Sequence, residues 1–246
     1  MTSQAFDPEF EAELLRVHIN SLLVKWGQSK PPRGGLHASS VLVPDSEWCS
    51  RCHVLAAVYP DRAEQPEAKP WDAHQNAVFA NGWSLHERWQ DLFKKFGDCV
   101  EAETPHYDET RELWFTPDVI LRFAGETYVV EIKGYKSETF DKLHDEPPEA
   151  AMLQCNLYLH LLGLKKGIVL VENKNTQDIK LWVIEHNPEL VRLYTHRMYD
   201  VKGATIMVKK HGPAKLPARV CGSPNDRLAA KCPMRNLCFS SEVEHG

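Results

Sequence analysis

Hydrophobic side chains recur at helical spacing in five segments of the chain. In residues 10–26 and 76–96, apolar positions lie three or four residues apart, as expected for helices with one buried face. Residues 49–59 and 187–199 carry shorter patterns of the same kind. Residues 147–164 are apolar on nearly every side, which is typical of a helix packed against a sheet. We therefore predict a helix over each of these segments.

Short runs rich in β-branched and aromatic residues lie between the predicted helices. Such runs favour strands, because these side chains pack well on a pleated surface. The predicted strands cover residues 99–103, 112–115, 118–123, 127–133, 168–172 and 179–184. Helices and strands that alternate in this way predict an α/β fold with a mixed central sheet and helices on both faces.

The remaining segments complete a single domain over residues 1–246, with its core at about residues 73–200. Residues 37–44 are predicted to be extended, and the polar stretches 29–35 and 60–70 to be loops. The tail from residue 211 is rich in Pro, Gly and Cys, so we expect loops held by something other than a core. Two cysteine-bearing segments, about residues 37–60 and 211–246, are expected to flank the core.

Composition places the chain among soluble proteins. Charged residues make up 26% and hydrophobic residues 43% of its 246 residues. No apolar run is long enough to cross a bilayer, and the first residues lack a basic and then apolar signal pattern. We therefore expect an intracellular, cytoplasmic protein with no membrane contact. Its net charge of −5 does not by itself favour nucleic-acid binding, yet an acidic protein can still line one groove with lysines and arginines.

The most informative stretch is FTPDVILRFAGETYVVEIKGY, residues 115–135. It predicts two strands joined by a tight turn at Ala124-Gly125-Glu126. Alternation along the second strand puts Glu131 and Lys133 on one side. If Asp118 faces the same way, two carboxylates and an ammonium converge. Two such carboxylates repel unless a cation lies between them, and oxygen ligands suit Mg²⁺ or Mn²⁺. The hairpin is thus predicted to hold a divalent metal that assists attack of water on a phosphodiester.

Two further groups bear on this hypothesis. His86 is predicted to face inward, together with Phe79, Trp83, Trp89, Phe93 and Phe96 along one stripe of its helix. Gln154 and Tyr158 lie four residues apart, hence on one face of their helix, where they can position a phosphate or a metal-bound water. Taken alone, each of these residues is more often a hydrogen-bonded core residue than a functional one.

The order of these motifs resembles the PD-(D/E)XK nuclease superfamily. Its signature is matched by Pro117-Asp118 followed by Glu131-Ile132-Lys133. With His86 upstream and Gln154 and Tyr158 downstream, the pattern resembles the RecB-like branch, including the iron–sulfur exonucleases associated with CRISPR systems. The resemblance implies a restriction-endonuclease-like fold and a prokaryotic or viral origin.

The resemblance also implies roles for individual residues. Asp118, Glu131, the carbonyl of Ile132 and His86 would bind the metal. Lys133 would orient or activate the attacking water and offset charge on the phosphate. The catalytic set would be completed by two residues that position the DNA strand or support the metal shell, Gln154 and Tyr158. Lys174 is a weaker candidate for a phosphate contact.

Seven cysteines are unevenly placed in the chain. Cys99 and Cys155 lie in predicted core elements and are expected to be packing residues. In the iron–sulfur members of the branch, one cysteine before the core and three after it bind a [4Fe–4S] cluster that joins the two terminal segments. Here that set would be Cys49, Cys221, Cys232 and Cys238, with Cys52 as competitor for one position. A structural Zn²⁺ site stays open, because Cys49-x-x-Cys52 has zinc-knuckle spacing.

The resemblance as a whole implies a metal-dependent DNA nuclease, an exonuclease on single-stranded DNA or frayed ends. A structure-specific or restriction-like endonuclease with the same centre is the first alternative. A non-catalytic DNA-binding or adaptor module is the second. Four aromatic residues are candidates for stacking on unpaired bases: Tyr107, Trp114, Tyr128 and Tyr135. Partner proteins would belong to recombination, repair or CRISPR adaptation.

Overall fold

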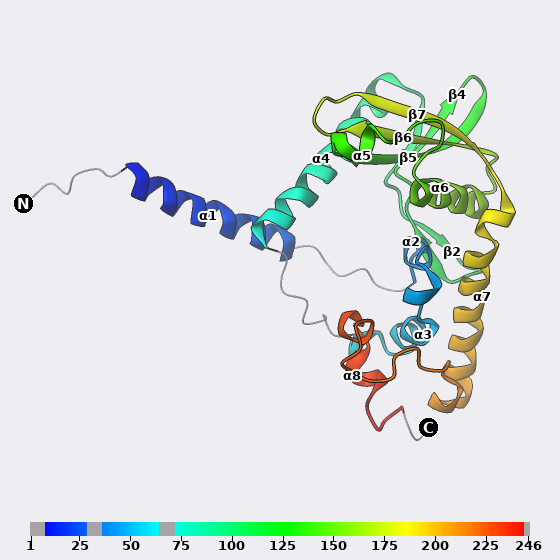
Figure 1. Ribbon diagram of the computed structural model, residues 1–246. Helices are drawn as coiled ribbons and strands as arrows, with labels where there is room; N and C mark the ends of the chain where they lie inside the picture. The colour runs from blue at the N-terminus through cyan, green and yellow to red at the C-terminus, as the bar shows by residue number, and fades with distance from the viewer. Residues whose placement is uncertain (1–7, 29–35, 64–71, 244–246) are drawn as a thin grey trace, which may run out of the picture.

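A five-stranded mixed sheet organises the computed structural model, which describes residues 8–28, 36–63 and 72–243 (Figure 1). Its strands are β1 (Cys99–Ala102), β4 (Val119–Phe123), β5 (Glu126–Tyr135), β6 (Lys166–Asn173) and β7 (Ile179–Glu185). They lie in the order β1-β4-β5-β6-β7. The β5–β6 pair is parallel and the other three pairs are antiparallel. The predicted mixed α/β architecture is confirmed.

Helices cover both faces of the sheet, and alternation along the strands decides which residues meet them. On one face, α4 (Ala73–Phe96) packs Leu85 against a cluster that includes Val130 and Ile132. On the other face, α6 (Glu149–Leu162) is buried together with Val129. Because neighbouring strand residues point to opposite faces, β5 reads as a continuous apolar run interrupted by Glu131. Glu131 is one of the acids predicted to bind the metal.

The β4–β5 hairpin fixes the register on which the site depends. Phe123 pairs with Glu126, and Ala124 and Gly125 form the two-residue turn with φ values of 50° and 82°. Positive φ at both central residues gives the turn a twist that matches antiparallel strands, and glycine adopts this conformation without steric cost. The register continues to the pair Val119 and Val130. Asp118 therefore lies opposite Glu131.

A second group of elements lies beside the sheet and is linked to it by the long helix α7 (Pro188–His211), which runs from the sheet to the lower part of the molecule (Figure 1). The predicted helix over residues 187–199 is correct but twelve residues too short. The short helical elements of this group are α2 (Ala38–Val41), η1 (Asp45–Glu47), α3 (Ser50–Val58), η2 (Pro60–Arg62), η3 (Pro213–Lys215), η4 (Ala229–Lys231) and α8 (Arg235–Cys238).

The tail has a small core, contrary to the prediction. Met234, Leu237 and Val243 are buried against Leu55 of α3. Arg51, which is 7% exposed, donates from Nη1 to the carbonyl of Pro217 over 2.9 Å and from Nη2 to that of Val243 over 3.5 Å. The apolar residues of the tail occur in short groups without a helical or strand period, so the pattern alone could not reveal a core that α3 completes. The front and rear segments are thus joined by apolar packing and by one buried arginine.

Local structure differs from the predictions in three other places. Residues 37–44 are extended only in part: His37 forms an isolated bridge with Trp114, whereas α2 occupies the centre of the segment and His37 caps it by accepting a hydrogen bond from the backbone of Ser39. The strand β2 (His106–Asp108) was not predicted; it pairs with β3 (Leu113–Phe115) in a separate two-stranded sheet. The short helix α5 (Ser137–Phe140) was also not predicted. The predicted loop at 29–35 and most of the one at 60–70 lie outside the described residues.

The aromatic residues of α4 do not form one inward stripe as predicted. Trp89 and Phe93 pack against the sheet, whereas Phe96 is 85% exposed. Trp83 makes an edge contact with Trp26, their ring centres being 6.2 Å apart. That partner belongs to α1 (Pro8–Gln28), the predicted first helix, which extends away from the body of the molecule (Figure 1). None of the described helices has both the length and the apolar character needed to cross a bilayer.

Close packing between α6 and β6 gives a first prediction. A Cβ atom on Gly167 would lie 2.3 Å from Cys155 Sγ and 3.1 Å from the carbonyl oxygen of Val129. Gly167→Ala should therefore destabilise the fold by about 1–3 kcal/mol through overpacking. Gly203→Ala is the matched control, because nothing lies within 4 Å of that position in α7. It should stabilise the helix by about 0.5–1 kcal/mol. Urea unfolding followed by circular dichroism measures both, and equal effects would contradict the packing described.

Candidate active site

The predicted acids meet where the hairpin passes between α4 and α6. Glu131 is fully buried and Asp118 is 9% exposed. Asp118 Oδ2 accepts a hydrogen bond from the backbone N–H of Ile132 over 2.7 Å, which holds the first carboxylate beside the second strand. The two acids, 13 positions apart in sequence, are thereby fixed on adjacent strands.

On the α4 side, the site is closed by His86. Its Nδ1 lies 3.3 Å from Asp118 Oδ1, and 23% of its side chain is exposed. The predicted inward orientation is correct, because His86 contacts Asp118 and its neighbour Leu85 packs on the sheet. The histidine therefore reaches the same carboxylate that the backbone of Ile132 holds.

On the α6 side, three polar groups are linked by contacts. Lys133 Nζ lies 2.5 Å from Glu131 Oε1 and 3.4 Å from Gln154 Oε1. The Gln154 amide donates to Tyr158 Oη over 3.2 Å. The Tyr158 ring packs near Phe115 of β3, with ring centres 6.0 Å apart. The six predicted side chains thus form two sets of contacts on adjacent strands: His86 with Asp118, and Glu131 with Lys133, Gln154 and Tyr158.

Burial determines the electrostatics of these contacts. Desolvation, reinforced by the charge of Asp118 and opposed by Lys133, raises the pKa of Glu131 to about 8. Burial of Lys133 would lower its pKa, but Glu131 and then Asp118 outweigh that effect, and the pKa is raised. The site therefore combines an acid that is costly to ionise with a lysine that keeps its charge.

The donor set suits a divalent cation. Glu131 Oε2 is buried and has no hydrogen-bond partner among the described residues. An unsatisfied buried oxygen beside a second carboxylate is the position at which Mg²⁺ or Mn²⁺ would satisfy both. Across residues 8–28, 36–63 and 72–243, however, no group of three His, Cys, Asp or Glu side chains is arranged so that it could hold a metal ion. At this site Glu131 directs its Oε1 at Lys133.

The cysteines of the front and rear segments also come together. Cys49, Cys52, Cys221 and Cys232 line a cavity of about 220 Å³. Cys238 joins the same four around a smaller neighbouring space of about 20 Å³. The predicted packing roles of the other two cysteines fit their places, because Cys155 is buried in the main core and Cys99 packs beside the α4 cluster.

One pair of thiols is especially close. The Sγ atoms of Cys52 and Cys232 lie 3.3 Å apart. The hydrogen bond between the two thiols lowers the pKa of Cys232 to about 7 and raises that of Cys52. Burial raises the pKa of Cys49 and of Cys221. Cys52, named only as a competitor from the sequence, is thus in direct contact with a predicted ligand.

Sequence reasoning missed a charged group beside the site. Glu172 lies in the apolar strand β6, is 2% exposed and pairs with Arg88 of α4. The signal was available, because a glutamate within IVLVEN is unusual in a buried strand. Its partner is 84 residues earlier and cannot be found from spacing. Lys174, the weaker candidate, follows two residues after Glu172.

The four candidate stacking residues have different surroundings. Tyr107 and Trp114 are 46% and 44% exposed and lie opposite each other on β2 and β3, with ring centres 4.9 Å apart and ring planes tilted by 44°. Tyr128 and Tyr135 are half-buried on β5. The first pair therefore presents aromatic surface to solvent.

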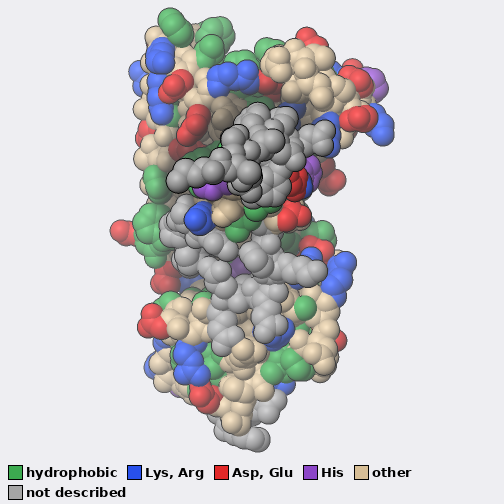
Figure 2. Space-filling model, turned by 90° about the vertical axis from the view of Figure 1, so that its left-hand side faces the viewer, with side chains coloured by type: hydrophobic (Ala, Val, Ile, Leu, Met, Phe, Trp, Pro, Cys, Tyr) green, Lys and Arg blue, Asp and Glu red, His purple; other side chains and the backbone are tan. Residues whose placement is uncertain are grey.

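The surface charge is mixed over the face that Figure 2 displays. Basic and acidic side chains alternate across its described part, with no extended basic area there. This agrees with the net charge of −5. A polyanion would consequently be recognised at local groups of cations.

Comparison with known proteins gives structural similarities alone. No family model matches the chain, and no curated protein matches its sequence. The crystal structure of SSO0001 is similar at a TM-score of 0.46 and 18% identity, over 79% of this chain and 86% of that one. An alkaline exonuclease from Laribacter hongkongensis, LHK-Exo, is similar at a TM-score of 0.45 and 14% identity, over 75% and 95%. Its complex with dAMP gives 0.44 and 15%, with the same coverage. Because these TM-scores are below 0.5 and the identities are below 20%, the similarities do not assign a function to this chain.

The raised pKa of Glu131 predicts an unusual pH dependence for the metal-free protein. The folded pKa of about 8 exceeds the ordinary value of 4.5, so a penalty builds up as the pH rises from about 5 to 8. In EDTA, the free energy of unfolding should fall over that range. Glu131→Gln should remove the fall and raise Tm at neutral pH by about 2–4 °C or more. The exposed Glu185→Gln is the control and should keep the wild-type profile. Identical profiles for both variants would contradict the electrostatics described.

Proposed function

We propose that the protein is a divalent-metal-dependent deoxyribonuclease that hydrolyses phosphodiesters. The observation that carries the proposal is the fully buried Glu131, whose Oε2 lacks a partner among the described residues, on the strand next to Asp118. A structural carboxylate would be satisfied by donors, as Glu172 is by Arg88 and Trp89. A buried acid kept unsatisfied beside another acid is the arrangement expected of a cation site.

The metal would be held by Asp118, Glu131, the carbonyl of Ile132 and His86, once the Glu131 carboxylate turns away from Lys133. Bound Mg²⁺ or Mn²⁺ would supply a Lewis acid for the phosphate and lower the pKa of a water molecule. Lys133 would act on the substrate, and Gln154 and Tyr158 would position the DNA strand or support the metal shell.

The chain's own polar groups would position and stabilise the reacting phosphate. Lys133 would place its ammonium on a phosphate oxygen, where negative charge increases in the transition state. Gln154 holds Lys133 and is itself held by Tyr158, so this pair would fix the lysine's direction. The Phe115 ring packs beside Tyr158 and keeps the phenol in place.

Attack from the end of a single strand, or from a frayed end, is the mode that we propose. It comes from the resemblance to RecB-like exonucleases. The exposed pair of Tyr107 and Trp114 supports a single-stranded substrate, because unpaired bases stack on such rings. The partner proteins would accordingly act in recombination, repair or CRISPR adaptation.

Loss of the acid or the lysine should abolish cleavage. Glu131→Ala and Lys133→Ala should each reduce Mg²⁺- or Mn²⁺-dependent degradation of end-labelled single-stranded DNA by at least about 10²-fold, since each removes a group that stabilises the transition state. Both variants should stay folded and bind DNA. Glu185→Ala and Lys209→Ala, at exposed positions, are the matched controls and should keep wild-type rates.

The substrate separates the proposal from its alternatives. Circular single-stranded DNA should resist degradation while linear DNA is consumed from its ends. Cleavage of the circle would identify an endonuclease, and binding without cleavage under either metal would identify a non-catalytic module. Unchanged cleavage by both Glu131→Ala and Lys133→Ala would refute the proposed nuclease function.

We also propose that the cysteines hold a [4Fe–4S] cluster, with structural Zn²⁺ as the alternative. Three ligands would be Cys49, Cys232 and Cys238, and the fourth either Cys221 or Cys52. Support comes from the convergence of all five on adjoining cavities. Thiolates are the ligands of both groups. The role would be structural, because the tail has only a small apolar core with which to hold itself on α3.

Metal analysis tests this second site. Protein purified without oxygen should be brown and contain iron and sulfide, and serine at Cys49, Cys232 or Cys238 should lower both contents. Cys155→Ser, in the main core, should leave them unchanged. Comparison of Cys52→Ser with Cys221→Ser identifies the fourth ligand, which is the one whose loss removes iron. Absence of iron, sulfide and zinc would end the hypothesis.

A further inference from the structure

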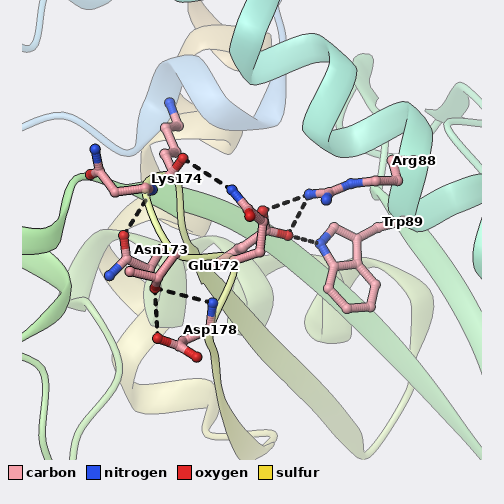
Figure 3. Close-up of polar contacts among 9 residues, drawn as sticks. Arg88, Trp89, Glu172, Asn173, Lys174 and Asp178 are labelled. Atoms are coloured by element: carbon pink, nitrogen blue, oxygen red, sulfur yellow. Dashed lines mark hydrogen bonds and ion pairs between the residues drawn. The ribbon is translucent and has the colours of Figure 1, made fainter.

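A second charged cluster lies on the α4 side of the sheet and has no part in the chemistry above. Its centre is Glu172, near the end of β6 and 2% exposed. Arg88 Nη2 lies 2.5 Å and 2.6 Å from the two carboxylate oxygens. The Trp89 indole donates to Oε2 over 2.6 Å. Figure 3 shows both side chains reaching from α4 to this carboxylate.

The contact fixes the arginine more than it stabilises the fold. Burying a carboxylate carries a desolvation cost that an ion pair offsets only in part. An apolar residue in β6 would pack against α4 without that cost. What the pair achieves is a defined position for Arg88, whose side chain is 52% exposed. Only Nη2 is used, so within the described residues Nε and Nη1 have no partner.

A second cation, Lys174, lies beside Leu85, which is three residues before Arg88 on α4. A Cβ on Gly134 would lie 2.6 Å from Lys174 Cε and 2.7 Å from Leu85 Cδ1, so both side chains pack over this glycine of β5. Gly134 follows Lys133, and Leu85 precedes His86. Lys174 is half-buried, and no acid lies within ion-pair distance of its Nζ in the described part of the chain.

We propose that Arg88 and Lys174 form a second phosphate-binding site, for a phosphodiester that neighbours the one at the metal centre. Glu172 would be a positioning residue that aims the Arg88 guanidinium. The inference rests on the proposed function, because its ligand is the same nucleic-acid strand. Lys133 faces α6 whereas these two cations lie on the α4 side, so together they would hold consecutive phosphates across the end of β5.

Binding in EDTA tests the site without catalysis. A fluorescein-labelled single-stranded oligonucleotide is titrated with protein at several salt concentrations. Arg88→Gln and Lys174→Gln should each raise Kd about tenfold at low salt and reduce the slope of log K against log salt by about 0.7. Lys209→Gln, at the far end of α7, is the control and should change neither value.

Glu172→Gln separates positioning from simple charge. It removes a negative charge beside the site, so general electrostatics would tighten DNA binding. Loss of the positioning contact should instead weaken binding severalfold. Melting temperatures are measured alongside, and Arg88→Gln combined with Glu172→Gln should regain the stability that Arg88→Gln alone loses.

The outcomes distinguish this inference from the function on which it rests. Wild-type binding with an unchanged slope in Arg88→Gln and Lys174→Gln would overturn the second site, whether or not the protein cleaves DNA. A reduced slope in both variants without any cleavage would uphold the site and refute the nuclease. Tighter binding by Glu172→Gln would remove the positioning role. If the wild-type protein bound no DNA, both proposals would fall.

Discussion

The fully buried carboxylate of Glu131, held opposite Asp118 by the β4–β5 register, is the constraint on which the rest of the site depends. An ionised group at that depth is strongly disfavoured, and a second acid beside it increases the cost. The ion pair with Lys133 offsets part of this cost, while Oε2 has no hydrogen-bond partner among the described residues. A buried carboxylate that is so costly can be kept in place only when the surrounding packing is stable enough to bear the cost. Here that packing is an apolar strand covered on both faces.

Polar groups reach the site from both of the helices that cover the sheet. Gln154 and Tyr158 reach the site from α6, and His86 reaches it from α4. The cations divide in the same way, with Lys133 toward α6, and Arg88 and Lys174 toward α4. A strand of nucleic acid crossing the end of β5 would therefore meet positive charge on both sides. This matters for a molecule whose net charge is −5 and whose described surface mixes charges.

The cysteine-bearing part is held together by a small apolar core and by Arg51, not by a sheet. α7 carries the chain from the sheet to α3, where the tail returns and closes a small core. Arg51 joins both segments through backbone carbonyls. Apolar burial there is limited, so a bound cluster or metal would add stability that the side chains do not supply. Cys52 and Cys232, 180 positions apart in sequence, are brought into contact there.

The sequence by itself determined the elements whose pattern is local. The β4–β5 hairpin, α6 and most of α4 followed from alternation, helical spacing and a glycine turn, and the hairpin placed Asp118 opposite Glu131. Contacts between distant segments were decided only by the tertiary structure. α2, β2 and the core of the tail exist because other elements complete them, and the aromatic side chains of α4 are shared between the sheet and α1. Arg88 and Glu172 likewise meet across 84 positions. Periodicity records which face of an element is buried, whereas the partner that buries it is a property of the whole fold.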